Sequence, residues 1–482
     1  MHGVAVTGAA VARALAARGV RVLVADDSPD DSKRALAGEL GTDLVERPDS
    51  DAIARLLHTV DFVSPAPGVP ETHELVRAAI SLGVPLRTEI DLAYEWEQER
   101  RGGPRPIVAI TGTDGKTSTT MLTAALLAAG GVRSVAVGNT EVPFVTALDD
   151  DVDAFAVECS SFRLSWIRSF RANAAIWLNL APDHQNWHVS MDSYEQAKAN
   201  IFRLQRPSDV AVGSAQDAVV MRRLATAPGR HVTFGLADGD HQVVGDLTTD
   251  RDSRRFAGPM GEYASVSSLR RRFPHDLSNA LAAAAACVEA GLVAPDAVDA
   301  GLASFRVPAH RIEPVGQVDG ITWYNDSKAT SPHAALTAIR SFASIVLIAG
   351  GRNKGLDLDL LASEAARIRS VVAIGESAGE IESAFAGASP ATPVVRAGSM
   401  ADAVAVARSA ARDGDVVLLS PACASFDWYP DGGYPARGDD FRRLVVALAD
   451  APSRAASGVA SVAATGAASG THAARHGTGG AS

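Results

Sequence analysis

The chain has 482 residues, a net charge of −11 at pH 7, 47% hydrophobic residues and 21% charged residues. At about 150 residues per domain, this length and composition predict about three domains with ordinary hydrophobic cores. The acidic balance argues against nucleic-acid binding, which favours a basic surface. Cys159, Cys287 and Cys423 are scattered, which excludes a disulfide framework and a cysteine zinc site and suits a reducing compartment.

The amino terminus and the apolar stretches predict a soluble protein of the cytoplasm. Met1-His2-Gly3 lacks the basic region of a signal peptide. The longest apolar stretch, around Leu281 to Val288, stops at Glu289 and is far shorter than a membrane span. We therefore expect no membrane insertion.

Short apolar strands alternate with helical patterns over residues 1–103. Residues 20–25 and 61–64 predict strands, and residues 102–106 predict a linker rich in Gly and Pro. The segment from Val4 to Gly8 is typical of a turn between a strand and a helix, but almost nothing precedes it. We therefore expect the first strand of this domain to be missing, because the chain begins late or because the sheet lacks that member.

Two further series of strands and helices follow. The predicted strands are residues 107–110, 154–157, 174–178, 345–348, 371–374 and 416–419. Alternating strands and helices predict mostly parallel sheets covered by helices on both faces. We predict an α/β protein of three tandem domains, and their bounds are 1–103, 104–306 and 307–450.

Residues 451–482 differ in composition from the rest of the chain. Of these 32 residues, 25 are Ala, Gly, Ser or Thr, and none is acidic. A segment with so little apolar bulk cannot offset its ordering entropy. We therefore predict a disordered tail.

A glycine-rich loop follows the strand at residues 107–110 and begins a helix. It reads Thr111-Gly112-Thr113-Asp114-Gly115-Lys116-Thr117. Glycines let backbone amides approach phosphate oxygens, Lys116 can neutralise phosphate, and Thr117 can bind Mg²⁺. Ile110 replaces the first glycine of the full phosphate-loop pattern, so an ordinary turn is the alternative. The lysine directly after a glycine at a helix start favours phosphate binding.

Other candidates in the middle of the chain follow predicted strands. Glu158 ends one strand and suits Mg²⁺, although a solvated strand-end acid is an equal alternative. His184 follows the next strand, and two such residues favour a shared site. The residues around Lys198 predict a helix with a solvent-exposed lysine, and Cys159 and Cys423 are interpreted as packed thiols.

The last third of the chain carries three polar clusters and a boundary pair. The boundary is His310-Arg311, and the clusters are residues 325–330, 350–355 and 420–427. Each cluster alone is compatible with a polar turn. Several cations at strand ends in an acidic protein predict an anionic substrate. The residues alone therefore predict binding of ATP, Mg²⁺ and a carboxylate-bearing substrate, and leave the reaction open.

These motifs, in order from about Val4 to Leu448, resemble the Mur ligases, ATP-dependent enzymes that add amino acids to the peptidoglycan precursor. The motifs are residues 111–117, 158–164, 183–184, Lys198, 310–311, 325–330, 350–355 and 420–426. The resemblance implies a Rossmann-like UDP-binding domain, a central P-loop-type ATPase and a Rossmann-like carboxyl-terminal domain. It implies that a cytoplasmic monomer joins D-glutamate to UDP-N-acetylmuramoyl-L-alanine through an acyl phosphate, in cell wall synthesis needed for cell shape and division. A ligase like folylpolyglutamate synthetase and a non-catalytic nucleotide-binding paralogue are the alternatives.

The resemblance also implies roles for individual residues. ATP would contact Gly112, Thr113, Asp114, Gly115, Lys116, Thr117, Ser118, Asn279, Arg311 and Asp326. The UDP substrate would contact Val6, Thr7, Asp26, Asp27, Gly68, Asn139 and His184. D-Glutamate would contact Lys328, Thr330, Lys354, Ser425 and Phe426. The implied catalytic residues are Lys116, Glu158, His184, Lys198 and Lys328, and the implied metal ligands are Thr117, Glu158, His184 and Lys198 as a carbamate.

The chain departs from the family pattern at a few positions. Asp114 stands where the phosphate loop usually has Asn, and Asn139 is followed by Thr140-Glu141 in place of Ile-Gly. The segments at residues 64–68 and 427–437 each carry two extra residues. We expect these departures to alter substrate affinity without removing a chemical role.

Overall fold

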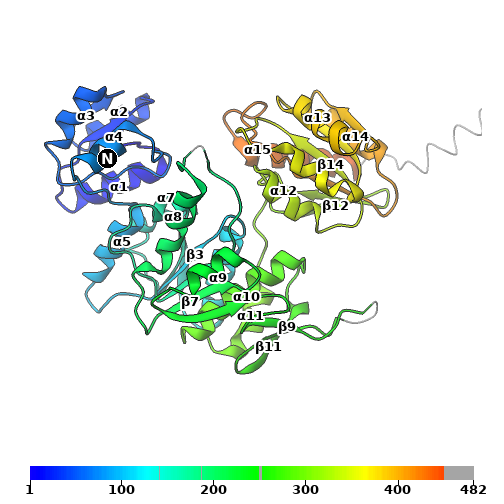
Figure 1. Ribbon diagram of the computed structural model, residues 1–482, viewed down its shortest axis with the longest axis horizontal. Coiled ribbons are helices and arrows are strands. Elements are labelled where there is room, and N and C mark those ends of the chain that lie inside the picture. Colours follow the sequence, from blue (N-terminus) through cyan, green and yellow to red (C-terminus); the bar gives the residue numbers. More distant parts are fainter. Residues whose placement is uncertain (141, 186, 249–251, 450–482) are drawn as a thin grey trace, which may run out of the picture. The chain divides into compact units, whose positions relative to one another are not determined.

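The computed structural model describes residues 1–140, 142–185, 187–248 and 252–449, so the predicted disordered tail lies outside the described residues. The chain divides into two compact units, Met1–Pro308 and a unit that begins at Ala309 (Figure 1). Each unit contains helices packed on sheets, which confirms the predicted α/β class with several sheets. The bounds of the three domains stay a prediction. None of the helices in these ranges has the length and apolar character needed to cross a membrane.

The first hundred residues form helices around a small parallel sheet. Strand β1 (Val24–Asp26) pairs in parallel with β2 (Leu44–Glu46). The helices are α1 (Val6–Ala17), α2 (Asp31–Glu39), α3 (Ser50–Leu57), α4 (Glu74–Ser81) and α5 (Glu89–Gln98).

The strand expected at residues 20–25 forms only from Val24 onward, as β1. The segment that lies along its other side, residues 1–3, is short. His2 alone makes parallel bridges to Ala25 and Pro65. The Ala25 amide donates to the carbonyl of Met1 at 3.0 Å, and the Gly3 amide donates to the carbonyl of Ala25 at 3.0 Å. Beyond this point a groove of about 300 Å³ separates residues 20–25 from residues 59–64. Strand pairing therefore starts only at Val24.

The rest of the first unit is built on a six-stranded parallel sheet of order β4-β5-β3-β6-β7-β8. Its strands are β3 (Ile107–Thr111), β4 (Ser134–Gly138), β5 (Ala154–Glu158), β6 (Ala174–Trp177), β7 (Val210–Ser214) and β8 (Arg230–Phe234). A smaller antiparallel sheet contains β9 (Gln242–Val244), β10 (Arg255–Gly258) and β11 (Gly261–Ser265). The large sheet is buried on both faces, as expected when helices connect parallel strands.

Two layers of helices cover the two faces of this sheet. One face packs against α6 (Lys116–Ala129), α10 (Pro274–Glu289) and α11 (Val298–Ser304). The other packs against α7 (Ser161–Leu164), α8 (Met191–Arg203), α9 (Ala218–Leu224) and the elements of the first hundred residues. The described part of this unit also contains three short 3-10 helices: η1 (Phe144–Thr146), η2 (Val266–Ser268) and η3 (Pro295–Ala297).

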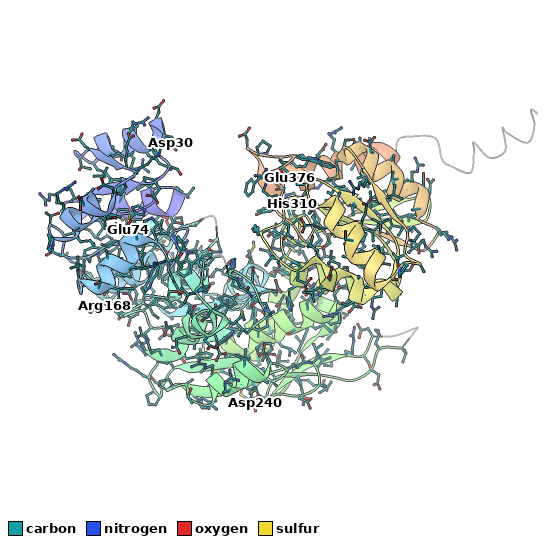
Figure 2. The ribbon with its side chains drawn as sticks, turned by 45° about the horizontal axis from the view of Figure 1, so that its top comes forward. Asp30, Glu74, Arg168, Asp240, His310 and Glu376 are labelled. Atoms are coloured by element: carbon teal, nitrogen blue, oxygen red, sulfur yellow. The ribbon has the colours of Figure 1, made fainter. Side chains whose placement is uncertain are left out.

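Buried polar contacts attach α5 to α7 and to the segment that follows α7. Nη1 of Arg163 donates to Oε2 of Glu89 at 2.6 Å, and both side chains are nearly inaccessible. The carboxylate of Asp91 accepts hydrogen bonds from the backbone amides of Arg168, Ser169 and Phe170 (Arg168 is labelled in Figure 2). A buried carboxylate requires such partners, so these contacts fix the place of α5.

The second unit contains a mixed six-stranded sheet of order β12-β13-β17-β14-β15-β16, in which only the pair β12 and β13 is antiparallel. Its strands are β12 (Glu313–Val318), β13 (Ile321–Asn325), β14 (Ile345–Gly350), β15 (Ile368–Ile374), β16 (Val394–Arg396) and β17 (Val416–Leu419). Its helices are α12 (Pro332–Ile339), η4 (Leu358–Arg367), α13 (Ala378–Ala388), α14 (Met400–Ala410) and α15 (Gly433–Ala449). Because β13, β17 and β14 are parallel neighbours, the loops that follow them meet at one edge of the sheet.

Candidate nucleotide and amino-acid sites

The phosphate loop connects β3 to the first turn of α6. Gly115 caps this helix with a left-handed backbone, φ 83°, and Lys116 is the first helical residue. Nζ of Lys116 donates to the carbonyls of Gly112 at 2.9 Å and Thr113 at 2.7 Å. The first amides of a helix have no intrahelical partners and carry partial positive charge. The loop can therefore surround a phosphate group with amides and one ammonium group.

Asn179, which follows β6, holds this loop in place. Its Oδ1 accepts hydrogen bonds from the amides of Thr113 at 3.0 Å and Asp114 at 2.9 Å. The hydroxyl of Thr113 also contacts the hydroxyl of Tyr194 at 3.1 Å. These contacts order the loop before any ligand binds, which lowers the entropic cost of binding.

Gly115 leaves no room for a side chain. A Cβ atom at this position would lie 2.5 Å from Oδ1 of Asn279 and 3.1 Å from Cδ1 of Leu178. We expect Gly115→Ala to weaken ATP binding about tenfold or more. The added methyl group would collide with Asn279, so the loop must move out of the arrangement that binds phosphate. Titration calorimetry with ATP measures the effect. Gly131→Ala is the matched control, because Gly131 has φ +80° but no atom within 4 Å of its Cβ position. Equal losses of affinity in both variants would contradict the packing explanation.

Glu158 ends β5 next to the phosphate loop and is 1% exposed. Its Oε1 accepts a hydrogen bond from Nδ2 of Asn139 at 3.0 Å. Its Oε2 is buried, and no hydrogen-bond partner for it exists within the described ranges. A buried, unpartnered carboxylate oxygen is unfavourable unless a cation approaches it. Glu158 therefore fits a divalent cation, and the register places Ile110 opposite it on the neighbouring strand.

Lys198 is buried on α8, which contradicts its interpretation from local sequence as a solvent-exposed lysine. The side chain is 1% exposed, and Nζ donates to the carbonyl of Gly112 at 2.6 Å. Nζ also lies 4.6 Å from the centre of the Tyr194 ring. Burial, together with the charge of Lys116, holds the pKa of Lys198 well below its usual value. The surroundings of Lys198 therefore favour the neutral form of its amine more than solvent does.

The remaining candidates of this region lie around the same edge of the sheet. His184 has a left-handed backbone, φ 55°, and its side chain is 37% exposed. Its ring packs edge-on against Phe162, with ring centres 4.7 Å apart. Thr117 and Ser118 lie in the first turn of α6, and Asn279 lies on α10 against Gly115. The structure thus gathers the loop, Glu158, Lys198 and Asn279 at one edge.

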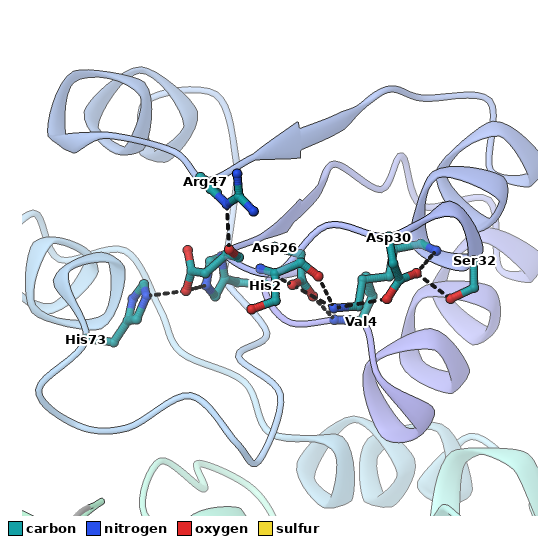
Figure 3. A network of polar contacts seen from close by, with 10 residues as sticks. His2, Val4, Asp26, Asp30, Ser32, Arg47 and His73 are labelled. Carbon is teal, nitrogen blue, oxygen red and sulfur yellow. Dashed lines mark hydrogen bonds and ion pairs between the residues drawn. The ribbon is translucent and has the colours of Figure 1, made fainter. Parts of the chain in front are cut away.

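The residues predicted to contact a UDP substrate lie near the end of β1. Asp26 accepts hydrogen bonds from the Val4 amide at 2.8 Å and from Nζ of Lys33 at 2.9 Å. Although burial opposes ionisation, these bonds hold the pKa of Asp26 below its usual value. Oδ2 of Asp27 contacts Nε2 of His2 at 3.2 Å and Nε2 of His73 at 2.9 Å (Figure 3).

Three other predicted UDP contacts have different surroundings. Val6 is 74% exposed at the first position of α1, and Gly68 is exposed. The hydroxyl of Thr7 accepts a hydrogen bond from Nη2 of Arg163 at 3.1 Å. Val6 and Thr7 therefore lie at a helix amino terminus, which favours an anionic group.

The candidates of the second unit surround the ends of β13 and β17. Oδ1 of Asp326 accepts from the Ile312 amide at 3.1 Å, and Oδ2 accepts from the Ser420 hydroxyl at 2.8 Å. Nζ of Lys328 lies 3.9 Å from the centre of the Tyr434 ring. Asp326 therefore joins the loop after β13 to the loop after β17.

The other candidates of this unit differ in exposure. Arg311 lies between His310 (labelled in Figure 2) and Ile312, which both have left-handed backbones. Ser425 is 2% exposed and Phe426 is 53% exposed. Lys354 is exposed and Thr330 is partly buried. The side chains of Lys354 and Phe426 are therefore accessible to a ligand.

The cysteines behave as the sequence predicts. Cys159, Cys287 and Cys423 are free and buried. Burial raises the pKa of the Cys423 thiol to about 11 and raises the pKa of the Cys159 thiol still further. Neither thiol is therefore poised as a nucleophile at neutral pH.

Sequence reasoning missed three residues that organise these sites. Asn179 directly follows the strand predicted at residues 174–178, so its place after a strand was an available signal. Tyr194 lies one helical turn before Lys198, which could have indicated a shared face. Arg437, whose Nη2 donates to the carbonyls of Ser327 and Cys423, gave no signal, because Ser327 lies 110 residues earlier in the chain.

Comparisons with known proteins find relatives that match most of the chain. The sequence profile described as "Mur ligase middle domain" matches residues 110–287, and "Mur ligase, glutamate ligase domain" matches residues 310–423. The UDP-N-acetylmuramoylalanine–D-glutamate ligase of Frankia casuarinae is 43% identical over 455 residues, covering 92% of this chain and 93% of the relative. The protein of the same name from Streptomyces avermitilis is 39% identical over 92% of this chain and 97% of its own length. A solved UDP-N-acetylmuramate–alanine ligase from Thermotoga maritima shares the fold, with a TM-score of 0.57 and 18% identity, covering 92% of this chain and 98% of that one.

Proposed function

This chain belongs to the Mur ligase family, and we propose that it uses ATP to join D-glutamate to UDP-N-acetylmuramoyl-L-alanine in peptidoglycan precursor synthesis. The phosphate loop beside the buried side chains of Glu158 and Lys198 carries this proposal. Relatives named for this activity match 92% of the chain. We further propose that the protein works in the cytoplasm as a monomer.

Amide formation from a carboxylate requires activation of a poor leaving group. In the proposed reaction the L-alanine carboxylate oxygen attacks the γ-phosphorus of ATP, which forms an acyl phosphate and releases ADP. The amino group of D-glutamate then attacks the acyl carbon, and the tetrahedral intermediate loses phosphate and a proton to give the amide. The loop amides and Lys116 would bind the phosphates, and Lys116 and Arg311 would offset the charge of the transferring phosphoryl group.

Mur ligases use ATP with Mg²⁺, and the donor atoms of the first unit suit that cation. We propose that Thr117, Glu158 and His184 hold it, because the hydroxyl and the carboxylate supply the oxygen atoms that Mg²⁺ prefers and the family resemblance implies His184 as a third ligand. When bound, Mg²⁺ neutralises negative charge on the phosphates. The orphaned Oε2 of Glu158 supports this assignment.

We propose that Lys198 carries a carbamate. Its neutral amine would attack CO₂ with loss of one proton, which replaces a cation with an anionic oxygen donor. The lowered pKa of the buried Lys198 supports this step, because only the unprotonated amine is a nucleophile. An ammonium group at this position would repel a metal ion, whereas a carbamate would attract it.

Two further assignments concern substrate binding. We place the UDP portion at the amino terminus of α1 with Val6, Thr7, Asp26, Asp27 and Gly68, in a Rossmann-like domain of residues 1–103. We place D-glutamate in a domain of residues 307–450, where Lys328 and Lys354 supply charge for its carboxylates. Residues 104–306 form the proposed ATPase domain.

Phosphate release from ATP tests this function. The purified protein is expected to release phosphate with Mg²⁺ and UDP-N-acetylmuramoyl-L-alanine only when D-glutamate is also present. Release with a pteroate acceptor would indicate the ligase that resembles folylpolyglutamate synthetase. No release with any acceptor would indicate the non-catalytic paralogue.

A further inference from the structure

Arg437 on α15 is a buried cation that no step of the proposed reaction uses. Its side chain is 1% exposed. Nε donates to the hydroxyl of Ser327 at 3.0 Å, and Nη2 donates to the carbonyls of Ser327 at 2.8 Å and Cys423 at 3.1 Å. Ser327 directly precedes Lys328, and Cys423 lies two residues before Ser425. One guanidinium group therefore ties together the loops after β13 and β17.

The same guanidinium group lies beside the loop after β14. A Cβ atom on Gly351 would lie 3.2 Å from Nη1 of Arg437, and Gly351 has φ +132°. The loop after β14 also carries Lys354. The backbone amide of Arg352 in this loop donates to the carbonyl of Ala424, in the loop after β17, at 2.8 Å. Arg437 thus lies where the ends of three neighbouring strands meet. Ligands of α/β sheets bind at this kind of edge.

The groups that accept hydrogen bonds from Arg437 are neutral oxygens. Within the described part of the chain it forms no ion pair, and its buried Nη1 has no hydrogen-bond partner. Asp326 and Asp427 lie near enough to favour its charged form. Burial lowers the pKa of Arg437 to about 10, so the group stays protonated at neutral pH. A buried charge of this kind is unfavourable for stability and creates positive potential at the sheet edge.

We propose that Arg437 is a positioning residue of the D-glutamate site, which orders the loops that carry Lys328, Lys354 and Ser425 and attracts the carboxylates of the amino acid. This inference rests on the proposed function. It differs from a purely structural role, in which Arg437 would support the fold of the unit without affecting one substrate more than the others. The two roles predict different kinetic behaviour.

Steady-state kinetics of Arg437→Ala, Arg437→Lys and the wild-type chain separate these roles. For Arg437→Ala we expect the KM for D-glutamate to rise about 10- to 100-fold, because hydrogen bonds to a charged group are lost. The KM values for ATP and the UDP substrate are expected to stay close to wild type. Added guanidinium chloride is expected to restore part of the D-glutamate affinity of Arg437→Ala. Arg437→Lys, which keeps the charge but loses the fork of donors, is expected to show a smaller rise.

Arg443→Ala is the matched control, because Arg443 lies on the same helix, is 69% exposed and pairs with Asp440. An unchanged KM for D-glutamate in both Arg437 variants would overturn the proposal. A lower melting temperature with equal changes in all three KM values and no rescue would also overturn it. If Arg437→Ala does not fold, the KM values of Arg437→Lys for D-glutamate, ATP and the UDP substrate are compared in its place. A wild-type chain that makes no product would contradict the proposed function instead.

Discussion

Lys198→Ala is expected to lower kcat about 100- to 1000-fold, which is the loss typical of removing one preorganised charged group from a phosphoryl-transfer site. The buried amine lies 2.6 Å from the carbonyl of Gly112, inside the phosphate loop. In the proposed carbamate form it supplies oxygen donors at the edge where Glu158 also ends its strand. Coupled measurement of phosphate release gives kcat, and calorimetry with ATP shows whether the loop still binds nucleotide.

Chemical rescue distinguishes a carbamate from a structural lysine. Formate or acetate is expected to restore part of the activity of Lys198→Ala, because a small carboxylate can occupy the space of the lost carbamate. Asp192→Ala is the matched control, because Asp192 is an exposed residue in the first turn of the same helix. Full turnover of Lys198→Ala without added acid would contradict the proposed role.

The carbamate also predicts a dependence on pH. Because burial and Lys116 lower the pKa of Lys198, the neutral amine persists at a pH where an exposed lysine is fully protonated. As the pH falls through this lowered value, the amine becomes protonated and the carbamate is lost. We therefore expect added bicarbonate to raise the activity on the acidic side of the pH profile, as measured by initial rates.

Glu158→Gln is expected to lower kcat about 100-fold or more and to raise the Mg²⁺ concentration needed for half-maximal activity. The substitution keeps the shape of the side chain and the acceptor for Asn139, but removes the negative charge near the unpartnered Oε2. Because a buried unpaired charge destabilises the fold, the melting temperature of the variant without Mg²⁺ is expected to equal or exceed that of the wild type.

Opposite effects on activity and stability are the distinctive part of this prediction. Mg²⁺ titrations of activity and thermal unfolding in the presence of a chelator measure both. Asp153→Asn is the matched control, because Asp153 is exposed immediately before the same strand and pairs with Arg133. An unchanged Mg²⁺ response of Glu158→Gln would contradict its assignment as a ligand.

The features whose placement in the fold could be predicted from the sequence depend on local pattern. The phosphate loop lies within seven consecutive residues, and Glu158 directly follows an apolar strand. The parallel arrangement of the strands then brings both to the same edge, as the alternation of elements predicts. These candidates therefore needed no knowledge of long-range packing.

The features that could not be predicted from the sequence depend on contacts between distant segments. Lys198 is buried because α8 brings it to Gly112, which lies 86 residues earlier. Only the family resemblance, and not the helical pattern, indicated a role for this lysine. Arg437 contacts Ser327, which lies 110 residues earlier. The pairing of β1 depends on Met1 and Gly3 rather than on its own apolar pattern. Burial created by such contacts cannot be read from local composition.

Mass spectrometry of the products tests the proposed ligation most directly. The protein is incubated with ATP, Mg²⁺, D-glutamate and UDP-N-acetylmuramoyl-L-alanine that carries a heavy-oxygen label in the L-alanine carboxylate. We expect a nucleotide product heavier by one glutamyl residue, and one labelled oxygen in the released phosphate, because the acyl phosphate transfers that oxygen. Phosphate without the label, or an unchanged nucleotide substrate, would contradict ligation through an acyl phosphate.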